Sequence, residues 1–204
     1  MAMITLKRAR PALLLLLTLL LAGCYLPASF DAELELSRTG LYKMSFDGYI
    51  VELTLYKEIR EKKIDKKTEQ EKIARVIRDF KRDSSTKSVS HFGKGAFHVK
   101  WSKGGDIIRS RQVTFFRRNE NMLSITYNKN TAVITLAGRY IKKQDAQRLQ
   151  AMGLDVKGVI RIKTDAKVIS ENSQKKTVKD GVTTYGWRLN SVFDRAPKMV
   201  VVLR

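Results

Sequence analysis

Few side chains in this 204-residue chain are suited to chemistry, and the most distinctive is Cys24, the only cysteine. A lone cysteine cannot form a disulfide within the chain. His91 and His98 are the only histidines, and no acidic residue lies near them in the sequence until Asp106. We therefore expect both histidines to be surface or structural residues, and we expect no metal site and no cofactor.

The residues before Cys24 have the organisation of a secretory signal. Three cationic residues at positions 7, 8 and 10 precede an almost uninterrupted apolar run over residues 12–21. A run of about ten residues is too short to cross the roughly 30 Å hydrocarbon core of a bilayer as a helix. It matches the apolar region of a signal peptide instead, so residues 1–23 are left out of the fold prediction.

The tetrapeptide Leu21, Ala22, Gly23 and Cys24 resembles the lipobox of bacterial lipoproteins. In that family the cysteine thiol receives a diacylglyceryl group, the signal is cut before the cysteine, and the new amino group is acylated. The resemblance thus implies cleavage between Gly23 and Cys24, with a small residue before the cysteine to fit the peptidase. Several acyl chains on Cys24 would anchor the chain stably in a membrane. The alternative is a buried cysteine at the end of a plain signal or membrane helix.

The residue after the cysteine and the charge of the mature chain bear on location and partners. Tyr25, rather than an aspartate, follows Cys24; in lipoproteins of Gram-negative bacteria this favours the outer membrane, with the domain in the periplasm. Removal of residues 1–23 takes away three basic residues and no acidic one, so the formal charge falls from +20 to +17. The basic excess predicts an anionic partner. Because the domain is exported, we expect that partner not to be nucleic acid.

The composition predicts one globular domain over residues 31–204, joined to the lipid by a tether over residues 24–30. The chain is 43% hydrophobic with few glycines and prolines, which excludes disordered and collagen-like classes. Alternating apolar residues begin only at about Asp31. Six extended residues before that point reach about 20 Å, so the domain should often touch the lipid headgroups.

Periodicity predicts two clear helices. Over residues 68–82, Thr68 and Glu71 form a capping box, and the apolar residues from Ile73 to Phe80 recur at helical spacing. A shorter helix over residues 142–152 ends at Gly153. The stretch 49–63 fits a helix or a strand, and its charged second half favours a helix.

Short runs with strand character, separated by turn residues, fill the rest of the chain. Residues 170–180 are polar, and this composition predicts a mobile loop or a hairpin tip. The fold class is therefore α+β: a single domain with a mostly antiparallel β-sheet and two or three helices packed on it. Strands are expected near residues 32–36, 41–46, 88–92, 96–102, 107–116, 122–127, 131–136, 156–162, 183–189 and 199–203.

No motif in the chain predicts catalysis. The glycine turns near residues 48, 94 and 104 lack phosphate-loop spacing, and Ser84 and Ser85 have neither a base nor a nucleophile-elbow context. Paired carboxylates of a glycosidase are invisible in a sequence, but acidic residues are scarce. We expect a protein that is not an enzyme.

A stretch rich in basic residues, interleaved with Trp101, Phe115 and Phe116, is the best candidate binding surface. Such a mixture suits anionic lipid headgroups or other phosphates, and each Lys or Arg near an anionic surface contributes about 1 kcal/mol. The alternative is a generic cationic surface over core aromatic residues. The basic residues are Lys94, Lys100, Lys103, Arg109, Arg111, Arg117 and Arg118.

Two segments resemble bacterial lipoproteins with an LppM-like domain. They are residues 34–50, LELSRTGLYKMSFDGYI, and residues 180–203, with DGVTTYGWRL before PKMVVVL. The resemblance covers about a quarter of the chain. It implies an α+β envelope lipoprotein that contacts lipids or glycolipids, and it supplies no catalytic residues.

Three functional hypotheses follow from these observations. The first is a non-enzymatic lipoprotein, anchored through Cys24, whose basic domain contacts anionic lipids or glycolipids of the envelope. The second is an accessory subunit that docks an acidic protein in an envelope assembly. The third is a carrier of a hydrophobic ligand in a cavity between sheet and helices. The sequence does not indicate an oligomeric state.

Overall fold

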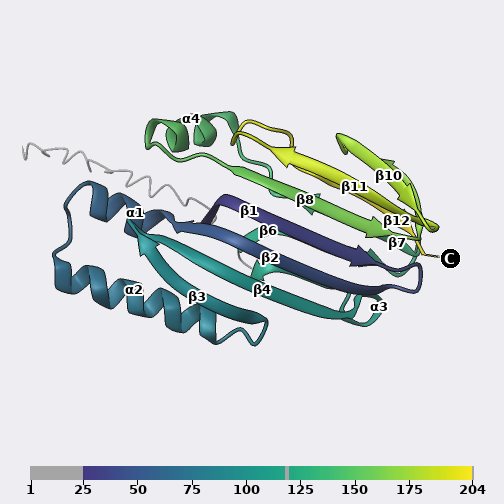
Figure 1. The fold of residues 1–204 in the computed structure, drawn as a ribbon, viewed down its shortest axis with the longest axis horizontal. Helices are drawn as coiled ribbons and strands as arrows, with labels where there is room; N and C mark the ends of the chain where they lie inside the picture. The colour runs from purple at the N-terminus through teal and green to yellow at the C-terminus, as the bar shows by residue number, and fades with distance from the viewer. Residues whose placement is uncertain (1–24, 118–119, 204) are drawn as a thin grey trace, which may run out of the picture.

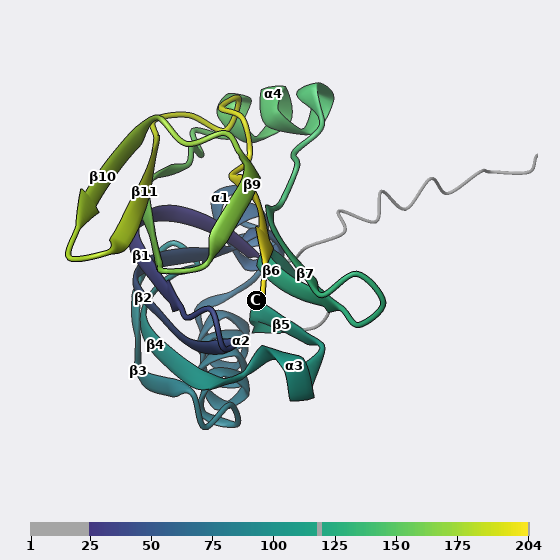
Figure 2. The ribbon, with the colours of Figure 1, turned by 90° about the vertical axis from the view of Figure 1, so that its right-hand side faces the viewer.

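The computed structural model describes residues 25–117 and 120–203, which form two β-sheets that face each other (Figures 1 and 2). All neighbouring strands are antiparallel except β1 and β8, which run parallel. Across the larger sheet the strands are β10 (Lys175–Lys179), β11 (Val182–Leu189), β8 (Lys157–Thr164), β1 (Tyr25–Leu36), β2 (Leu41–Glu52), β4 (Ala96–Asp106) and β3 (Thr86–Gly93). Across the smaller they are β5 (Gln112–Arg117), β6 (Glu120–Asn128), β7 (Val133–Gly138), β12 (Lys198–Val202) and β9 (Lys167–Glu171).

The described residues also form four helices, and the predicted α+β class is confirmed. α2 (Lys66–Lys81) buries Ile73, Val76 and Phe80, the stripe that its periodicity predicts, in the main core between the sheets. α1 (Leu53–Arg60) follows β2 directly, and α3 (Ile107–Ser110) is a single turn after β4. α4 (Lys143–Ala151) packs on a second apolar cluster near the start of β1. No helix in the described part of the chain is long and apolar enough to span a membrane.

The expected tether over residues 25–30 is wrong, because these residues are the first half of β1. The Tyr25 ring packs edge-on against Phe80 of α2, with ring centroids 5.6 Å apart, and Leu26 is 4% exposed. A shift of register between Pro27 and Ser29 interrupts the strand alternation here. Because of this irregularity, the alternation of apolar residues did not predict the first half of the strand. The strand begins immediately after Cys24, which lies outside the described residues.

Three local predictions also need correction. Asp65, not Thr68, caps α2: its carboxylate accepts a hydrogen bond from the Thr68 backbone N–H at 2.7 Å. The ambiguous stretch 49–63 is divided, since β2 continues to Glu52 before α1 begins. The expected strand over residues 107–116 starts with α3, whose first N–H groups are capped by Asp106. The polar segment 170–180, expected to be a mobile loop or a hairpin tip, contains the end of β9 and all of β10; β10 forms a hairpin with β11 through a turn at residues 180–181.

Candidate ligand cavity

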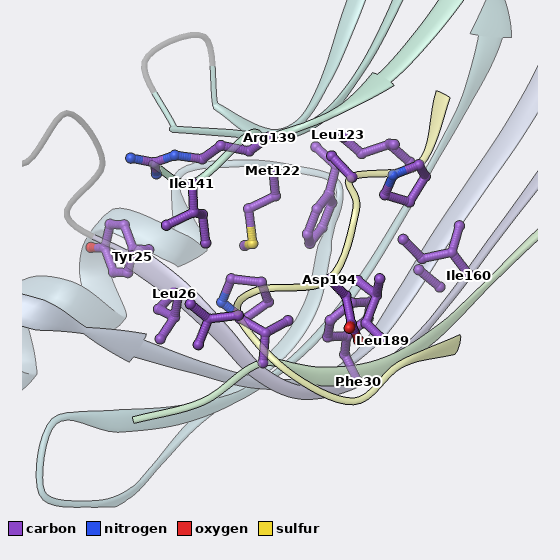
Figure 3. Close-up of a pocket in the computed structure, with 18 of the residues that line it drawn as sticks. Tyr25, Leu26, Phe30, Met122, Leu123, Arg139, Ile141, Ile160, Leu189 and Asp194 are labelled. Carbon is purple, nitrogen blue, oxygen red and sulfur yellow. The ribbon is translucent and has the colours of Figure 1, made fainter. Parts of the chain in front are cut away.

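A cavity of about 370 Å³ lies between the two sheets, near the start of β1. The larger sheet contributes residues of β1, β2, β8 and β11, and the smaller contributes residues of β5, β6 and β7. Further lining comes from α1, α4 and the segments 139–142 and 191–197. This volume lies within the roughly 300–1,000 Å³ of typical ligand pockets. Most of the side chains around its centre are apolar, including Leu26, Phe30, Met122, Leu123, Ile141 and Ile160 (Figure 3).

Two glycines shape the floor of the cavity. Phe30 of β1 is paired with Gly48 on one side and Gly158 on the other. A Cβ atom at Gly158 would stand 2.6 Å from the Phe30 ring, and one at Gly48 would stand 2.5 Å from the Ser29 carbonyl oxygen. The absence of both side chains therefore lets the Phe30 ring lie against the sheet. Space above the ring is left open for the cavity.

A stack of aromatic rings bounds the cavity where the two sheets meet. Phe46 of β2 stacks on Phe30 at 5.5 Å and on Phe115 of β5 at 4.4 Å. Phe115 in turn meets the edge of Trp101 at 4.9 Å. Because offset and edge-on aromatic contacts stabilise packing beyond simple burial, this stack holds the sheets together beside the cavity.

Carboxylates hold the loop that forms another wall. Asp155, just before β8, accepts a hydrogen bond from the Val192 backbone N–H at 2.7 Å. Asp194 accepts from the backbone N–H groups of residues 190 and 191. These bonds fix the segment between β11 and β12 against the connection from α4 to β8. Both carboxylates are thus used as structural acceptors.

The segment between β7 and α4 lines the cavity with both apolar and basic residues. The Arg139 backbone N–H donates to the Met122 carbonyl at 3.0 Å, and its guanidinium extends away from Leu123 (Figure 3). Tyr140 beside it is 76% exposed, which places the edge of the cavity at the protein surface. Among the described side chains, no carboxylate lies within ion-pair distance of Arg139 or Lys142. This edge therefore offers unpaired positive charge next to apolar lining.

The outer face of the larger sheet carries paired charges rather than a free basic surface. His98 Nε2 lies 2.8 Å from Asp47 Oδ1, and Lys100 Nζ lies 3.1 Å from Asp47 Oδ2. The sequence did not indicate Asp47 as a partner of His98, because Asp47 lies on the neighbouring strand and is distant in sequence. Partial desolvation favours the neutral acid, but the hydrogen bonds from Lys100 and His98 outweigh it and lower the pKa of Asp47.

The carboxylates of β1 on this face also have cationic partners. Glu33 accepts a hydrogen bond from Lys163 at 2.7 Å, and this bond, with that from Arg161, lowers the pKa of Glu33. In the described ranges, no three His, Cys, Asp or Glu side chains lie close enough together to hold a metal ion.

The structure does not gather the predicted basic residues into one patch. Lys94 lies in the turn between β3 and β4, whereas Arg109 lies in α3 beyond the other end of β4. The eleven residues of β4 separate these positions by about 35 Å. Lys100 lies between them on the outer face, paired with Asp47.

Two further predicted basic residues, Lys103 and Arg111, lie near α3. The Arg111 guanidinium lies 5.5 Å from the centroid of the Tyr127 ring, and Lys103 is exposed near the end of β4. Arg117 ends β5, and its side chain is not described; Arg118 lies outside the described residues. The sequence missed the cavity edge at Arg139 and Lys142, because residues 139–142 have no periodic pattern to indicate burial.

Comparisons with known proteins identify similar structures but no family. No family model matches the chain, and no curated protein matches it. The folded domain of LppM from Mycobacterium tuberculosis is similar over 89% of this chain and 91% of that one, with 10% identity and a TM-score of 0.42. An M1 zinc metallopeptidase from Deinococcus radiodurans is similar over 88% of this chain, with 9% identity and a TM-score of 0.35; this chain spans 42% of the peptidase. At these identities and TM-scores, neither similarity shows a family for this chain.

Proposed function

We propose that this chain is a cell-envelope lipoprotein, anchored through a lipid on Cys24, that binds the apolar chain of a lipid between its two sheets. The observation that carries the proposal is the apolar cavity of about 370 Å³ beside the start of β1. Its volume suits one acyl chain or a molecule of similar size. Each methylene group moved from water into such a site is stabilised by about 0.8 kcal/mol.

The charges at the cavity edge favour an anionic lipid. Arg139 and Lys142 adjoin the apolar lining, and the nearby Asp145 is paired with Arg148 at 3.3 Å. A phosphate or carboxylate headgroup bound here would keep its charge near water while the acyl chain enters the cavity. This retains the anionic-lipid contact expected from the composition and moves it from the 94–118 stretch to the 139–142 segment.

A binding protein rather than an enzyme fits the roles of the polar groups near the cavity. Asp155 and Asp194 accept backbone hydrogen bonds that hold the wall, and neither is joined to a nucleophile. We place the anchored chain in the outer membrane, with its domain in the periplasm, on the strength of the residue that follows Cys24.

Binding of a fluorescent fatty acid to the mature chain with Cys24→Ser tests the cavity without competition from the protein's own lipid. We expect saturable binding that Ala32→Phe weakens roughly tenfold, a loss of about 1.4 kcal/mol, because Ala32 lines the cavity. Met122→Trp is a second cavity-filling variant, and Val178→Phe, at a 69% exposed position of β10, is the matched control.

The competing functions predict different results in this assay. A protein that only contacts anionic membranes, or only docks an acidic partner, would show no saturable uptake of the fatty acid. Equal binding by the parent chain and by both cavity-filling variants would also contradict the proposal.

A further inference from the structure

We infer that the end of the domain at which β1 begins is its membrane-contacting face, so that the cavity edge lies on the headgroup layer of the anchoring leaflet. This inference rests on the proposed lipid at Cys24 and names the source of the ligand: the lipids of that same leaflet. The occupant of the face is the bilayer surface itself.

The first support is the length of the connection. Tyr25 follows Cys24 by one peptide bond, which spans 3.8 Å between Cα atoms. Tyr25 is fixed by Phe80 and by pairing with Glu52, and Leu26 is buried in the cluster that includes Val51. A lipid on Cys24 would therefore be joined directly to a packed strand, and this end of the domain could not move away from the bilayer.

The second support is the position of the cavity. Tyr25, Leu26 and Pro27 line it together with Tyr140 and Ile141. Figure 1 shows the start of β1 at the same end of the molecule as α1 and α4. The residue next to the anchor is thus part of the cavity wall, so a lipid could pass from the leaflet into the cavity along a short path.

The third support is the distribution of exposed aromatic residues. Among the large hydrophobic residues that the structure describes as exposed, the aromatic ones are Phe92, Tyr140 and Phe193, at 70%, 76% and 45%. Tyr140 adjoins the cavity lining, and Phe193 lies between two lining residues. Aromatic side chains are favoured at the interface between water and lipid.

Phe92 lies at the same end of the larger sheet as the start of β1, although it belongs to the edge strand β3. Tyr25 pairs with Glu52, Val51 pairs with Ala96, and Ala96 pairs with Gly93, the neighbour of Phe92. This row of paired residues runs across the sheet from the start of β1 to the end of β3. The exposed aliphatic residues lie outside this row; they are Leu41, Ile108, Ile169, Val178 and Val182. Phe92 therefore shares the anchored end with Tyr140 and Phe193, which lie at the cavity.

Basic residues accompany the aromatic ones on this face. Lys94 follows β3 directly, Lys142 and Lys143 start α4, and Arg195 lies two residues after Phe193; all four are exposed. Each such cation is attracted to an anionic leaflet. Lys94 also belongs to the predicted basic stretch, and the fold brings it to this face.

Fluorescence quenching in vesicles tests the inference with the lipidated mature protein. The vesicles contain phosphatidylethanolamine and phosphatidylglycerol with brominated acyl chains, which quench tryptophan by contact. Native Trp101 and Trp187 are both 2% exposed and give a shielded background. Phe92→Trp is the reporter, because Phe92 does not line the cavity and a lipid inside the cavity would not quench it. Val178→Trp, on β10, is the matched control.

We expect the Phe92→Trp signal to fall by about half or more when the protein is anchored, and the Val178→Trp signal to change little. A Gly/Ser linker of about twelve residues between Cys24 and Tyr25, with a mean span of about 20 Å, should reduce the quenching at least twofold while the protein still sediments with the vesicles. Sedimentation without quenching of Phe92→Trp, or equal quenching with and without the linker, would overturn the inference and leave the lipid anchor intact. Failure to sediment would overturn the anchor and the inference together, whereas fatty-acid binding in solution would still report on the cavity.

Discussion

The ring of Phe30 lies against Gly158 on the neighbouring parallel strand, in the space that a side chain at that position would take. A Cβ atom at Gly158 would stand 2.6 Å from both Cε1 and Cζ of the ring. Non-bonded carbon atoms prefer a separation of about 3.5–4.0 Å. The ring and the glycine therefore form one unit, and the free space above Phe30 depends on it.

Gly158→Ala should push the Phe30 ring into the cavity. The displaced atoms belong to a side chain rather than to the backbone, so the fold should survive with a loss of about 1–3 kcal/mol in the free energy of unfolding. Fatty-acid binding should weaken roughly tenfold, the equivalent of about 1.4 kcal/mol. Chemical denaturation and the fluorescence titration measure the two effects.

Gly186→Ala on β11 is the matched control, because the nearest atom to its Cβ is 3.6 Å away and no clash arises. It should change stability by no more than about 0.5 kcal/mol and leave binding unaltered. If both variants bound the fatty acid equally well, Phe30 would not form the cavity floor.

The sequence predicted the helices and strands whose apolar residues recur at regular spacing. It did not predict the features that depend on long-range contacts. The stripe from Ile73 to Phe80 predicted α2 because every third or fourth side chain enters the core. The first half of β1 escaped detection, since its bulge removes the alternation around Pro27. Phe30 consequently fell within an expected tether.

The candidate site was less predictable than the fold. Gly158 and Gly48 belong to different strands and share a neighbour only after the sheet has formed. The partnership of His98 with Asp47 likewise spans 51 positions. The basic residues of the 94–118 stretch are close in sequence, but the two ends of an extended strand lie far apart. A cluster of basic residues in the sequence therefore did not predict a patch on the surface.

The pairing of Glu33 with Lys163 predicts a pH-dependent contribution to stability. The folded protein lowers the pKa of Glu33 below its ordinary value of 4.5, chiefly through the Lys163 hydrogen bond. A carboxyl group with a lowered pKa stabilises the folded state above its unfolded pKa, and this stability is lost as the pH falls through its folded pKa. Glu33→Gln should therefore cost about 1 kcal/mol near pH 7, and the difference from the parent protein should shrink below pH 4.5.

Urea denaturation at a series of pH values measures this difference. Glu35→Gln on the same strand is the control, because Glu35 is about half exposed and lies 3.9 Å from Lys163. Its effect should be small at every pH. A constant penalty for Glu33→Gln from pH 7 to pH 3 would show that the charge of Glu33 does not contribute.

Asp83 connects the end of α2 to the core through Trp101. Its carboxylate accepts a hydrogen bond from Trp101 Nε1 at 2.8 Å and another from the Ser85 backbone N–H at 2.9 Å. Asp83→Ala leaves the buried indole N–H without its acceptor, and we expect a loss of about 2–3 kcal/mol. A shift in the near-ultraviolet circular dichroism of Trp101 should accompany it. Asp145→Ala, which removes only an exposed pair with Arg148, should cost less than about 1 kcal/mol.

The proposed anchor requires that the signal peptide be cleaved before Cys24 and that a lipid be attached to Cys24. The parent chain should yield a membrane-bound protein that begins at Cys24 and carries a lipid, seen as cleavage of residues 1–23 and an added lipid mass in intact mass spectrometry. Cys24→Ser removes the thiol that would receive the lipid, so we expect no added lipid mass and no incorporation of a labelled fatty acid. Gly23→Ala keeps a small side chain before the cysteine and should be processed normally, whereas Gly23→Trp should block cleavage. An unmodified Cys24 in the parent protein would contradict the lipid anchor, and the short connection to Tyr25 would then no longer hold the cavity against a bilayer.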